Sequence, residues 1–442
     1  MHTDAKFSLL NSVFAWSSRW SYAIIIFNVA LIACGKKDDV DFLVNPLAKV
    51  VAEDHKLAKV MGLNNALFKD MGDTLLDPWI FDVKEIYPAL CCFELDGEGK
   101  TWGAKGGGLY RSVVGSDGFE FVRQFTATVH GIHWTADNVL YVATDADRWD
   151  QNQPCRIYRS FDGGESFRLV KVLRTGSVLW WSISSDRKNN VFVGEYGPRD
   201  KGSGKRVWKT SDHGLSWEVA FHAPNIDGIH IHRVAVDPFT NHVWVTYGDN
   251  QHQGVFRSED EGVTWSKMRH AQSTAVVFTE EAIYWGEDTF EGTVTRYDRR
   301  TGRFTPVLTA MHEGSYGGSV YDMAIGKSGL IYVPMVKYSH QSHIPTLWVG
   351  DGREWKLLIE TNVEENRFGG FEHISSGDPN GFLFLKGYRI EERSKQLKPK
   401  IGRNRNTLDV AGVMSRPDHP DVATTMMQKQ SSGINVVEAR KR

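Results

Sequence analysis

Three eight-residue stretches decide the fold: SFDGGESF at 160–167, TSDHGLSW at 210–217 and SEDEGVTW at 258–265. All three follow one pattern, Ser/Thr-x-Asp-x-Gly-x-Ser/Thr-aromatic, and a degenerate copy, SDGFEF, lies at 116–121. The copies recur at intervals of roughly 50 residues, which is typical of the four-stranded blades of a propeller. The chain is therefore expected to be an all-β repeat protein.

Each copy has the composition of a tight turn between two strands. The Asp carboxylate can accept backbone N–H groups across the turn, and the Gly permits a positive φ where the chain reverses. The aromatic ring can then be buried between neighbouring sheets. A short alternating strand precedes each copy: RIYR at 156–159, RVWK at 206–209 and GVFR at 254–257.

The pattern resembles the Asp-box, or BNR, repeat of sialidases and related β-propellers. This resemblance implies a six- or seven-bladed β-propeller over residues 78–390. Weaker copies at 296–304 and 347–355 keep the strand-turn-strand layout, and further strands are expected at 371–376 and 382–385. The last unit could close the ring by pairing with an early strand around 79–82, which would protect exposed sheet edges.

Composition excludes several classes of protein. The chain has 442 residues and a formal net charge of −2, so it lacks the basic excess of a general nucleic-acid binder. A hydrophobic fraction of 41% is too low for a polytopic membrane protein. The four cysteines form no CxxC pair, which excludes a zinc ribbon.

The two ends of the chain differ from the repeat region. The apolar run at 22–33 has the length of a signal-peptide core, and its end, LIACG at 31–35, resembles a bacterial lipobox. Residues 1–34 are thus expected to be a signal or lipobox segment, with a lipid anchor on Cys34. The protein would then be exported or membrane-anchored; the alternative is a cytoplasmic protein with a buried helix here. Apolar spacing predicts a short helical lead-in at 35–77, and composition predicts a flexible, basic polar tail at 391–442.

In sialidase-like propellers the active site lies over the central channel, on the face opposite the Asp-box turns. Two groups of loops reach that face, namely those that enter the first strand of a blade and those that follow the second strand. The first group supplies His133, Trp180, His230, His232, Arg233, Tyr321, Glu372 and His373. The second supplies Glu195, Asp249, Glu287 and Asp288.

These residue types could place an acid and a base across a sugar ring. We assign catalytic roles to Glu195, His232, Asp249 and His133. Substrate binding is assigned to His230, Arg233, Trp180, Tyr321, Glu372, His373, Glu287 and Asp288. Alternation along a strand places the rings of His230 and His232 on the same side. Structural roles are the alternative: His133 could be a satisfied structural histidine, and Glu195 or Asp249 could cap loops.

The sequence departs from the sialidases at several points. The Arg-Ile-Pro motif is not visible, the arginines form no obvious triad, and no Tyr-Glu nucleophile pair stands out, so sialidase activity is not expected. The leading hypothesis is a carbohydrate-directed propeller, a glycoside hydrolase or lyase that acts on a glycan or cell-surface polymer. The alternative is a non-catalytic glycan- or protein-binding propeller.

A third hypothesis is a divalent-cation site built from His230, His232, Glu195 and Asp249. These residue types can bind a hard or borderline cation. The sequence lacks a compact ligand motif such as HExxH, so no metal or other cofactor is assigned. No nucleic-acid partner is expected.

Overall fold

The protein is described here from a computed structural model. The model describes residues 79–86, 90–388 with short gaps, and 434–441. The gaps are 114–117, 146–153, 174–176, 198–204, 225–229, 250–251, 314–315, 362, 364–365 and 376–381. The chain divides into two units, Met1–Lys59 and Val60–Arg442, and every described residue belongs to the second. The predicted signal segment with Cys34, the helical lead-in at 35–77 and most of the predicted tail lie outside the described residues.

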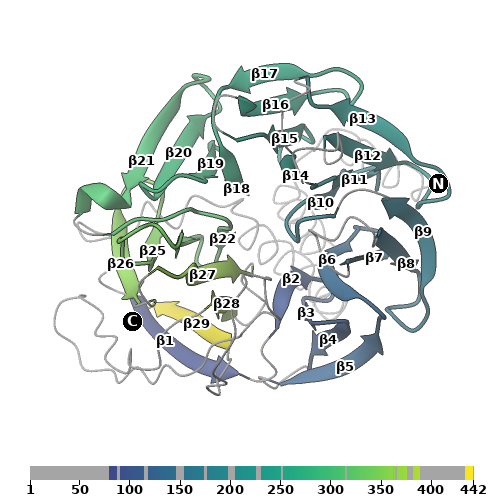
Figure 1. The fold of residues 1–442 in the computed structure, drawn as a ribbon, viewed down its shortest axis with the longest axis horizontal. Coiled ribbons are helices and arrows are strands. Elements are labelled where there is room, and N and C mark those ends of the chain that lie inside the picture. Colours follow the sequence, from purple (N-terminus) through teal and green to yellow (C-terminus); the bar gives the residue numbers. More distant parts are fainter. Residues whose placement is uncertain are drawn as a thin grey trace, which may run out of the picture. The chain divides into compact units, whose positions relative to one another are not determined.

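Seven antiparallel sheets surround a common axis and form the blades of a propeller (Figure 1). Blade 1 contains β2 (Cys91–Leu95), β3 (Thr101–Lys105), β4 (Gly108–Ser112) and β5 (Phe119–Gln124). Blade 2 contains β6 (Thr128–Trp134), β7 (Leu140–Asp145), β8 (Cys155–Ser160) and β9 (Arg168–Leu173). Blade 3 contains β10 (Ile183–Ser185), β11 (Val191–Gly194), β12 (Arg206–Thr210) and β13 (Glu218–His222). In each blade the strands follow one another in chain order from the axis outward, so successive blades repeat one topology.

Blades 4 to 6 continue the same order. Blade 4 contains β14 (Ile231–Val236), β15 (Val243–Tyr247), β16 (Gly254–Ser258) and β17 (Ser266–Arg269). Blade 5 contains β18 (Ser273–Phe278), β19 (Ala282–Glu287), β20 (Thr293–Asp298) and β21 (Phe304–Thr309). Blade 6 contains β22 (Ala324–Ile325), β23 (Ile331–Pro334), β25 (Thr346–Gly350) and β26 (Trp355–Glu360). A short 3-10 helix, η3 (Ala310–Glu313), follows β21 on the way to blade 6.

Blade 7 closes the ring with strands from both ends of the repeat region. Its order is β24 (Val336–Lys337), β27 (Gly369–Ile374), β28 (Phe382–Tyr388), β29 (Ile434–Lys441) and β1 (Trp79–Ile86). β29 pairs with β28 on one side and with the whole of β1 on the other. The predicted closure through the strand around 79–82 is confirmed, and the number of blades is seven.

The predicted tail is wrong at its end, because residues 434–441 form a strand of the ring. The composition of 391–442 as a whole is polar and hides the β-branched residues Ile434, Val436 and Val437. Backbone pairing supplies the remaining reason: an open ring would leave β28 and β1 with unpaired edges, and β29 fills the space between them.

The turns at 160–167, 210–217 and 258–265, here called the aspartate turns, have the hydrogen bonding that their sequence predicts. In the first, Asp162 Oδ1 accepts the Ser166 N–H at 2.9 Å and the Ser160 hydroxyl at 2.7 Å. The Ser160 hydroxyl oxygen in turn accepts the Gly164 N–H at 2.9 Å. Gly164 has a φ of 91°, a value that glycine adopts readily. The carboxylate thus links both ends of the turn.

The turns around Asp212 and Asp260 repeat these bonds. The hydroxyl and backbone donors lower the pKa of all three carboxyls from 3.8 to about 2. Each turn links the third and fourth strands of its blade. Because Ser160 pairs with Leu140 at the start of β7, this turn lies at the same end of the blade as the connection from β6 to β7. We call this end the lower face and the opposite end the upper face.

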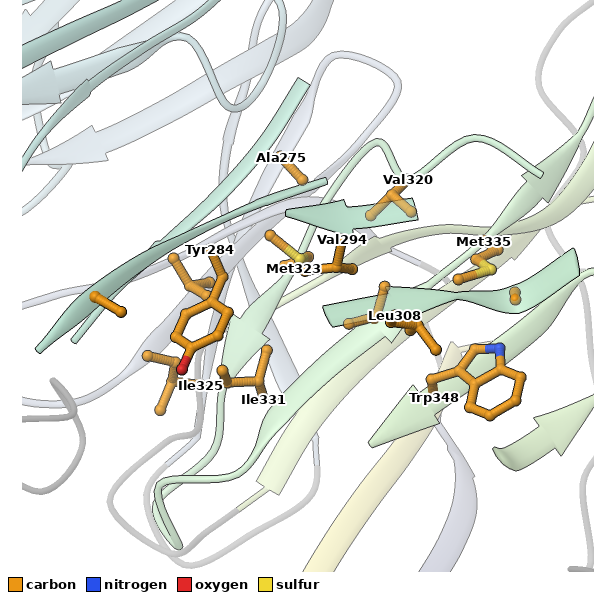
Figure 2. Close-up of a cluster of buried hydrophobic side chains, with 14 residues drawn as sticks. Ala275, Tyr284, Val294, Leu308, Val320, Met323, Ile325, Ile331, Met335 and Trp348 are labelled. Atoms are coloured by element: carbon orange, nitrogen blue, oxygen red, sulfur yellow. The ribbon is translucent and has the colours of Figure 1, made fainter. Parts of the chain in front are cut away.

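Each blade packs on the next through apolar side chains. Figure 2 shows the cluster between blades 5 and 6, in which Tyr284, Leu308, Met323 and Trp348 are buried. The aromatic residues of the aspartate turns contribute at other blade boundaries. Phe167 lies edge-on to Phe125 with ring centroids 5.1 Å apart, and the Trp265 indole donates a hydrogen bond to the Ala220 carbonyl of blade 3 at 2.8 Å. The turn motif therefore also joins each blade to the one before it.

Replacement of the three turn carboxylates should lower stability in a pH-dependent way. Their folded pKa values lie below 3.8, so ionisation stabilises the fold above about pH 4, and this contribution is lost as the pH falls toward 2. The triple variant Asp162→Asn, Asp212→Asn, Asp260→Asn should melt several degrees below the parent at about pH 7. The difference should close near pH 2. Glu165→Gln removes an exposed charge from the first turn and should leave the melting temperature nearly unchanged; an equal loss would contradict the assignment.

Candidate functional site

Two histidines and a carboxylate meet at the upper end of the channel. His230 directly precedes β14, His232 lies within it, and Asp249 is two residues beyond the end of β15. Asp249 Oδ1 is 3.0 Å from His232 Nε2, and Oδ2 is 3.8 Å from His230 Nε2. The two imidazole rings are 4.8 Å apart, so the predicted placement on the same side is confirmed. Both histidines are buried, and the Asp249 side chain keeps 23% exposure.

Blade 3 supports this histidine pair from one side. His230 Nδ1 is 3.2 Å from the Gly197 carbonyl oxygen. The Tyr196 ring lies over the His230 ring with a centroid distance of 4.0 Å. Trp181 Nε1 donates to the His232 carbonyl at 2.7 Å. These contacts hold both rings in place against the Asp249 carboxylate.

A chain of polar contacts continues into blades 5 and 6. Gln272 Nε2 lies 3.2 Å from Asp249 Oδ1 and 3.1 Å from Asp288 Oδ2, so one amide group bridges two carboxylates. Tyr338 donates its hydroxyl to Asp288 Oδ1 at 3.1 Å and also contacts the Tyr321 hydroxyl. We call the set His230, His232, Asp249, Gln272, Asp288 and Tyr338 the mouth cluster.

The two tyrosines are neutral hydrogen-bonding groups. Burial, followed by the charge of Asp288, raises the pKa of both Tyr321 and Tyr338 above the ordinary value. Neither hydroxyl is therefore prepared to ionise and act as a nucleophile near neutral pH. Both are suited to donate or accept hydrogen bonds toward a polar ligand.

Aromatic side chains fill the channel next to the mouth cluster. Trp180 and Trp181 lie edge-on with ring centroids 4.4 Å apart, and each is 8% exposed. Trp181 contacts Tyr321 of blade 6, whereas Trp180 contacts His373 of blade 7. Both tryptophans come from the loop that enters blade 3, and their contacts with blades 6 and 7 therefore cross the channel. We call these two rings the aromatic plug. Strand alternation would send the two rings to opposite faces, but both residues lie in a turn, where that rule does not hold.

An ion network lies against this aromatic plug. Asp322 is fully buried between Arg233, at 3.5 Å, and His373 Nδ1. The Phe93 N–H donates to His373 Nε2 at 2.9 Å, so the proton of a neutral ring sits on Nδ1 and faces Asp322. Burial by itself would raise the pKa of Asp322, but His373 and Arg233 hold it below the ordinary value. Arg233 and His373 therefore have a structural partner in the channel wall.

Two predicted site carboxylates do not reach the mouth cluster. The carboxylate of Glu195 lies 3.8 Å from Arg206 on the third strand of its own blade, and Glu287 lies 2.8 Å from Arg269 on the outer strand of blade 4. Burial raises the pKa of both. The backbone of Glu195 still pairs with Arg206, and Glu287 is the last residue of β19. Side chains of second-strand residues face neighbouring strands and blades, so among the carboxylates selected from the second strands only those beyond the strand end, Asp249 and Asp288, reach the mouth cluster.

His133 is also outside the mouth cluster, contrary to its predicted role. It is the sixth residue of β6 and pairs with Tyr141, so it lies near the lower end of the strand. Its ring contacts Glu94 Oε1 at 3.1 Å and Ser185 Oγ at 2.8 Å. The histidine is thus a satisfied structural residue, as the alternative interpretation had it.

Glu372 forms a buried ion pair with Lys386 at 2.7 Å within blade 7.

Sequence reasoning missed two members of the mouth cluster, Gln272 and Tyr338. Gln272 directly precedes β18, and Tyr338 directly follows β24 in the connection between the second and third strands of blade 6. Both positions satisfy the loop rule that selected the other candidates. Neither residue ionises near neutral pH, so a search for acids, bases and histidines passed over them.

Comparisons with known proteins agree with the fold. No family model and no curated protein matches the chain. Among solved structures it is similar to the extracellular domain of a candidate hybrid two-component system from B. thetaiotaomicron, with 13% identity and a TM-score of 0.50 over 70% of this chain and 39% of that chain. It is also similar to U3-55K, with 12% identity and a TM-score of 0.50 over 81% of this chain and 98% of that chain.

At these identities the similarity shows the fold alone. The chain spans well under half the length of the first of these structures, so that protein's other properties stay its own. The class that the fold defines is the seven-bladed β-propeller. Among the described residues, no helix is long and apolar enough to span a bilayer.

The ion network should be essential for stability. Asp322→Ala leaves Arg233 and His373 without their shared carboxylate in a buried position, and breaking a buried pair in this way costs about 3 kcal/mol. Denaturant unfolding followed by tryptophan fluorescence measures the loss. Asp288→Asn, at the partly exposed mouth cluster, is the comparison and should cost less than about 1 kcal/mol. Equal losses in the two variants would show that the network has no special weight.

Proposed function

We propose that this chain is a carbohydrate-directed propeller of the Asp-box type and that its upper mouth binds a glycan. The observation that carries the proposal is the mouth cluster itself, in which blades 4 to 6 supply histidines, acids, an amide and a tyrosine hydroxyl, and blade 3 adds the Tyr196 ring beside them. Sugars present many hydroxyl groups on a partly apolar ring, and such a ligand needs polar groups that both donate and accept next to aromatic surfaces.

The exposure of these side chains supports the assignment. Asp249, Gln272, Asp288 and Tyr338 are all partly exposed, so each can offer part of its hydrogen-bonding capacity to a ligand. Tyr196 is partly exposed too and presents a ring beside His230. The aromatic plug closes the channel behind them, which favours a ligand that lies across the mouth over one that passes through the ring.

The Asp-box turns support the finer family assignment. Their carboxylate-centred bonding is the same in three consecutive blades, and it arises from the sequence pattern by which the repeat was found. An exported location would suit a protein that acts on a cell-surface polymer, and the apolar run at 22–33 followed by Cys34 is the sequence feature behind that proposal.

Non-catalytic binding is the form of the proposal that the contacts favour. Two of the four residues selected for catalysis, Glu195 and His133, have structural partners away from the mouth cluster. A glycoside hydrolase or lyase is the second candidate, and one observation favours it. The 3.0 Å contact between Asp249 and His232 is the arrangement by which a carboxylate orients a histidine for proton transfer.

A glycan array probed with the full chain tests the proposal. The parent should bind a defined set of glycans, and Asp288→Asn should weaken that binding at least tenfold, because the ligand loses a charged acceptor. Glu165→Gln, on the lower face, should leave binding unchanged. Product analysis of the bound glycans then separates the candidates: intact glycan supports binding alone, whereas cleaved glycan supports the enzyme. Absence of binding to every glycan class would overturn the proposal.

A further inference from the structure

We propose that His230, His232 and Asp249 form a binding site for one divalent transition-metal ion at the upper mouth. The inference goes beyond the proposed function, because an ion can bind here whether or not a glycan does. Three independent features of the described residues carry it: the spacing of the ligand atoms, the tautomer of His230 and the chemistry of the donor set.

The spacing matches what a metal ion requires. One ligand atom from each residue lies within 4.8 Å of the other two. Zinc bonds to nitrogen and oxygen are about 2.0–2.1 Å long, so neighbouring ligands of a tetrahedral site are about 3.4 Å apart. The separations in the structure, 3.0 Å from Asp249 Oδ1 to His232 Nε2 and 3.8 Å from Asp249 Oδ2 to His230 Nε2, lie on either side of that value. Small rotations of the side chains would suffice to surround an ion.

The hydrogen bond of His230 prepares its other nitrogen as a ligand. The Gly197 carbonyl oxygen can only accept, so His230 Nδ1 carries the proton of this bond. In a neutral ring Nε2 then presents its lone pair toward Asp249 Oδ2. Histidine ligands in proteins are commonly oriented by a carbonyl in this way.

The carboxylate is oriented as well. Gln272 donates to Asp249 Oδ1 at 3.2 Å, which leaves Oδ2 directed at His230. A polar group that fixes a ligating carboxylate is the second feature that metal sites share. The Tyr196 ring also packs against the His230 ring, with a distance of 4.0 Å between the ring centroids.

The donor set selects the kind of ion. Two imidazoles and one carboxylate suit Zn²⁺ and its first-row neighbours, whereas Ca²⁺ and Mg²⁺ prefer oxygen ligands throughout. Within the ranges that the structure describes, no other three His, Cys, Asp or Glu residues have a comparable arrangement. Both histidines are buried and Asp249 is partly exposed, so a further coordination position would face the mouth. Three protein ligands with an open position are typical of zinc sites that bind a substrate or water.

Calorimetric titration of the chelator-treated full chain with ZnCl₂, in the absence of glycan, tests the site. The parent should bind about one equivalent, and CaCl₂ should give no comparable binding. His230→Ala should weaken Zn²⁺ binding by more than about 100-fold, because ligand loss exceeds the 10–100-fold effect of losing a supporting partner. His340→Ala removes an exposed histidine of the same face that is not a proposed ligand, and it should bind as the parent does.

Asp249→Asn provides a second variant with nearly unchanged shape. It should also lose Zn²⁺ binding, while its melting temperature without metal stays close to that of the parent. The proposal is overturned if the parent binds no Zn²⁺, or if both ligand variants keep the parent's stoichiometry and affinity. Because glycan is absent from every titration, a negative result here leaves the glycan-array result unaffected, and the converse also holds.

Discussion

The short hydrogen-bonded circuit around one aspartate is the interaction on which the propeller depends. In each aspartate turn the carboxylate accepts bonds from both ends of the same hairpin, and a glycine with positive φ lets the chain reverse between them. Formation of this turn fixes the register of the third and fourth strands. It also directs the aromatic residue that follows onto the preceding blade, as Phe167 and Trp265 do. A local circuit thereby sets a contact between blades.

The blade geometry then determines which side chains can reach the axis. Most residues inside the second strands point toward neighbouring strands and blades, where they form apolar clusters and paired charges that hold the ring together. Glu195 and Glu287 belong to this group, with Arg206 and Arg269 as partners. Residues one or two positions past a second strand are free of that constraint, and for this reason Asp249 and Asp288 reach the mouth cluster.

The centre of the ring combines a closed interior with a polar opening. Trp180 and Trp181 bridge the channel, and the Asp322 network lies against them. These contacts join blade 3 to blades 6 and 7 across the ring. The mouth cluster is built from loops of successive blades, and the contacts from His232 through Gln272 to Tyr338 give it a continuous hydrogen-bonded frame.

Much of the fold and part of the site could be predicted from sequence. The repeat predicted an all-β propeller and the hydrogen bonding of the aspartate turns, because these features depend on local turn chemistry and on a period that is visible in the residues. The closing role of the strand near 79 was predicted from the need to protect sheet edges. The shared side of His230 and His232 follows from strand alternation, and the structure agrees. The closing strand at 434–441 was not recognised, since its pairing partners are far away in the chain.

Only the tertiary structure decided which candidate residues meet. His133 and Glu195 satisfied the same loop rule as Asp249, yet one lies at the lower end of its strand and the other faces the outer strands. Gln272 and Tyr338 do not ionise near neutral pH, so their residue types gave no reason to select them. They belong to the mouth cluster through their contacts with Asp288. The sequence by itself determined the repeated unit, because turn chemistry is local. The composition of the mouth depends on strand ends, bulges and the angle between blades, which exist only once the ring has closed.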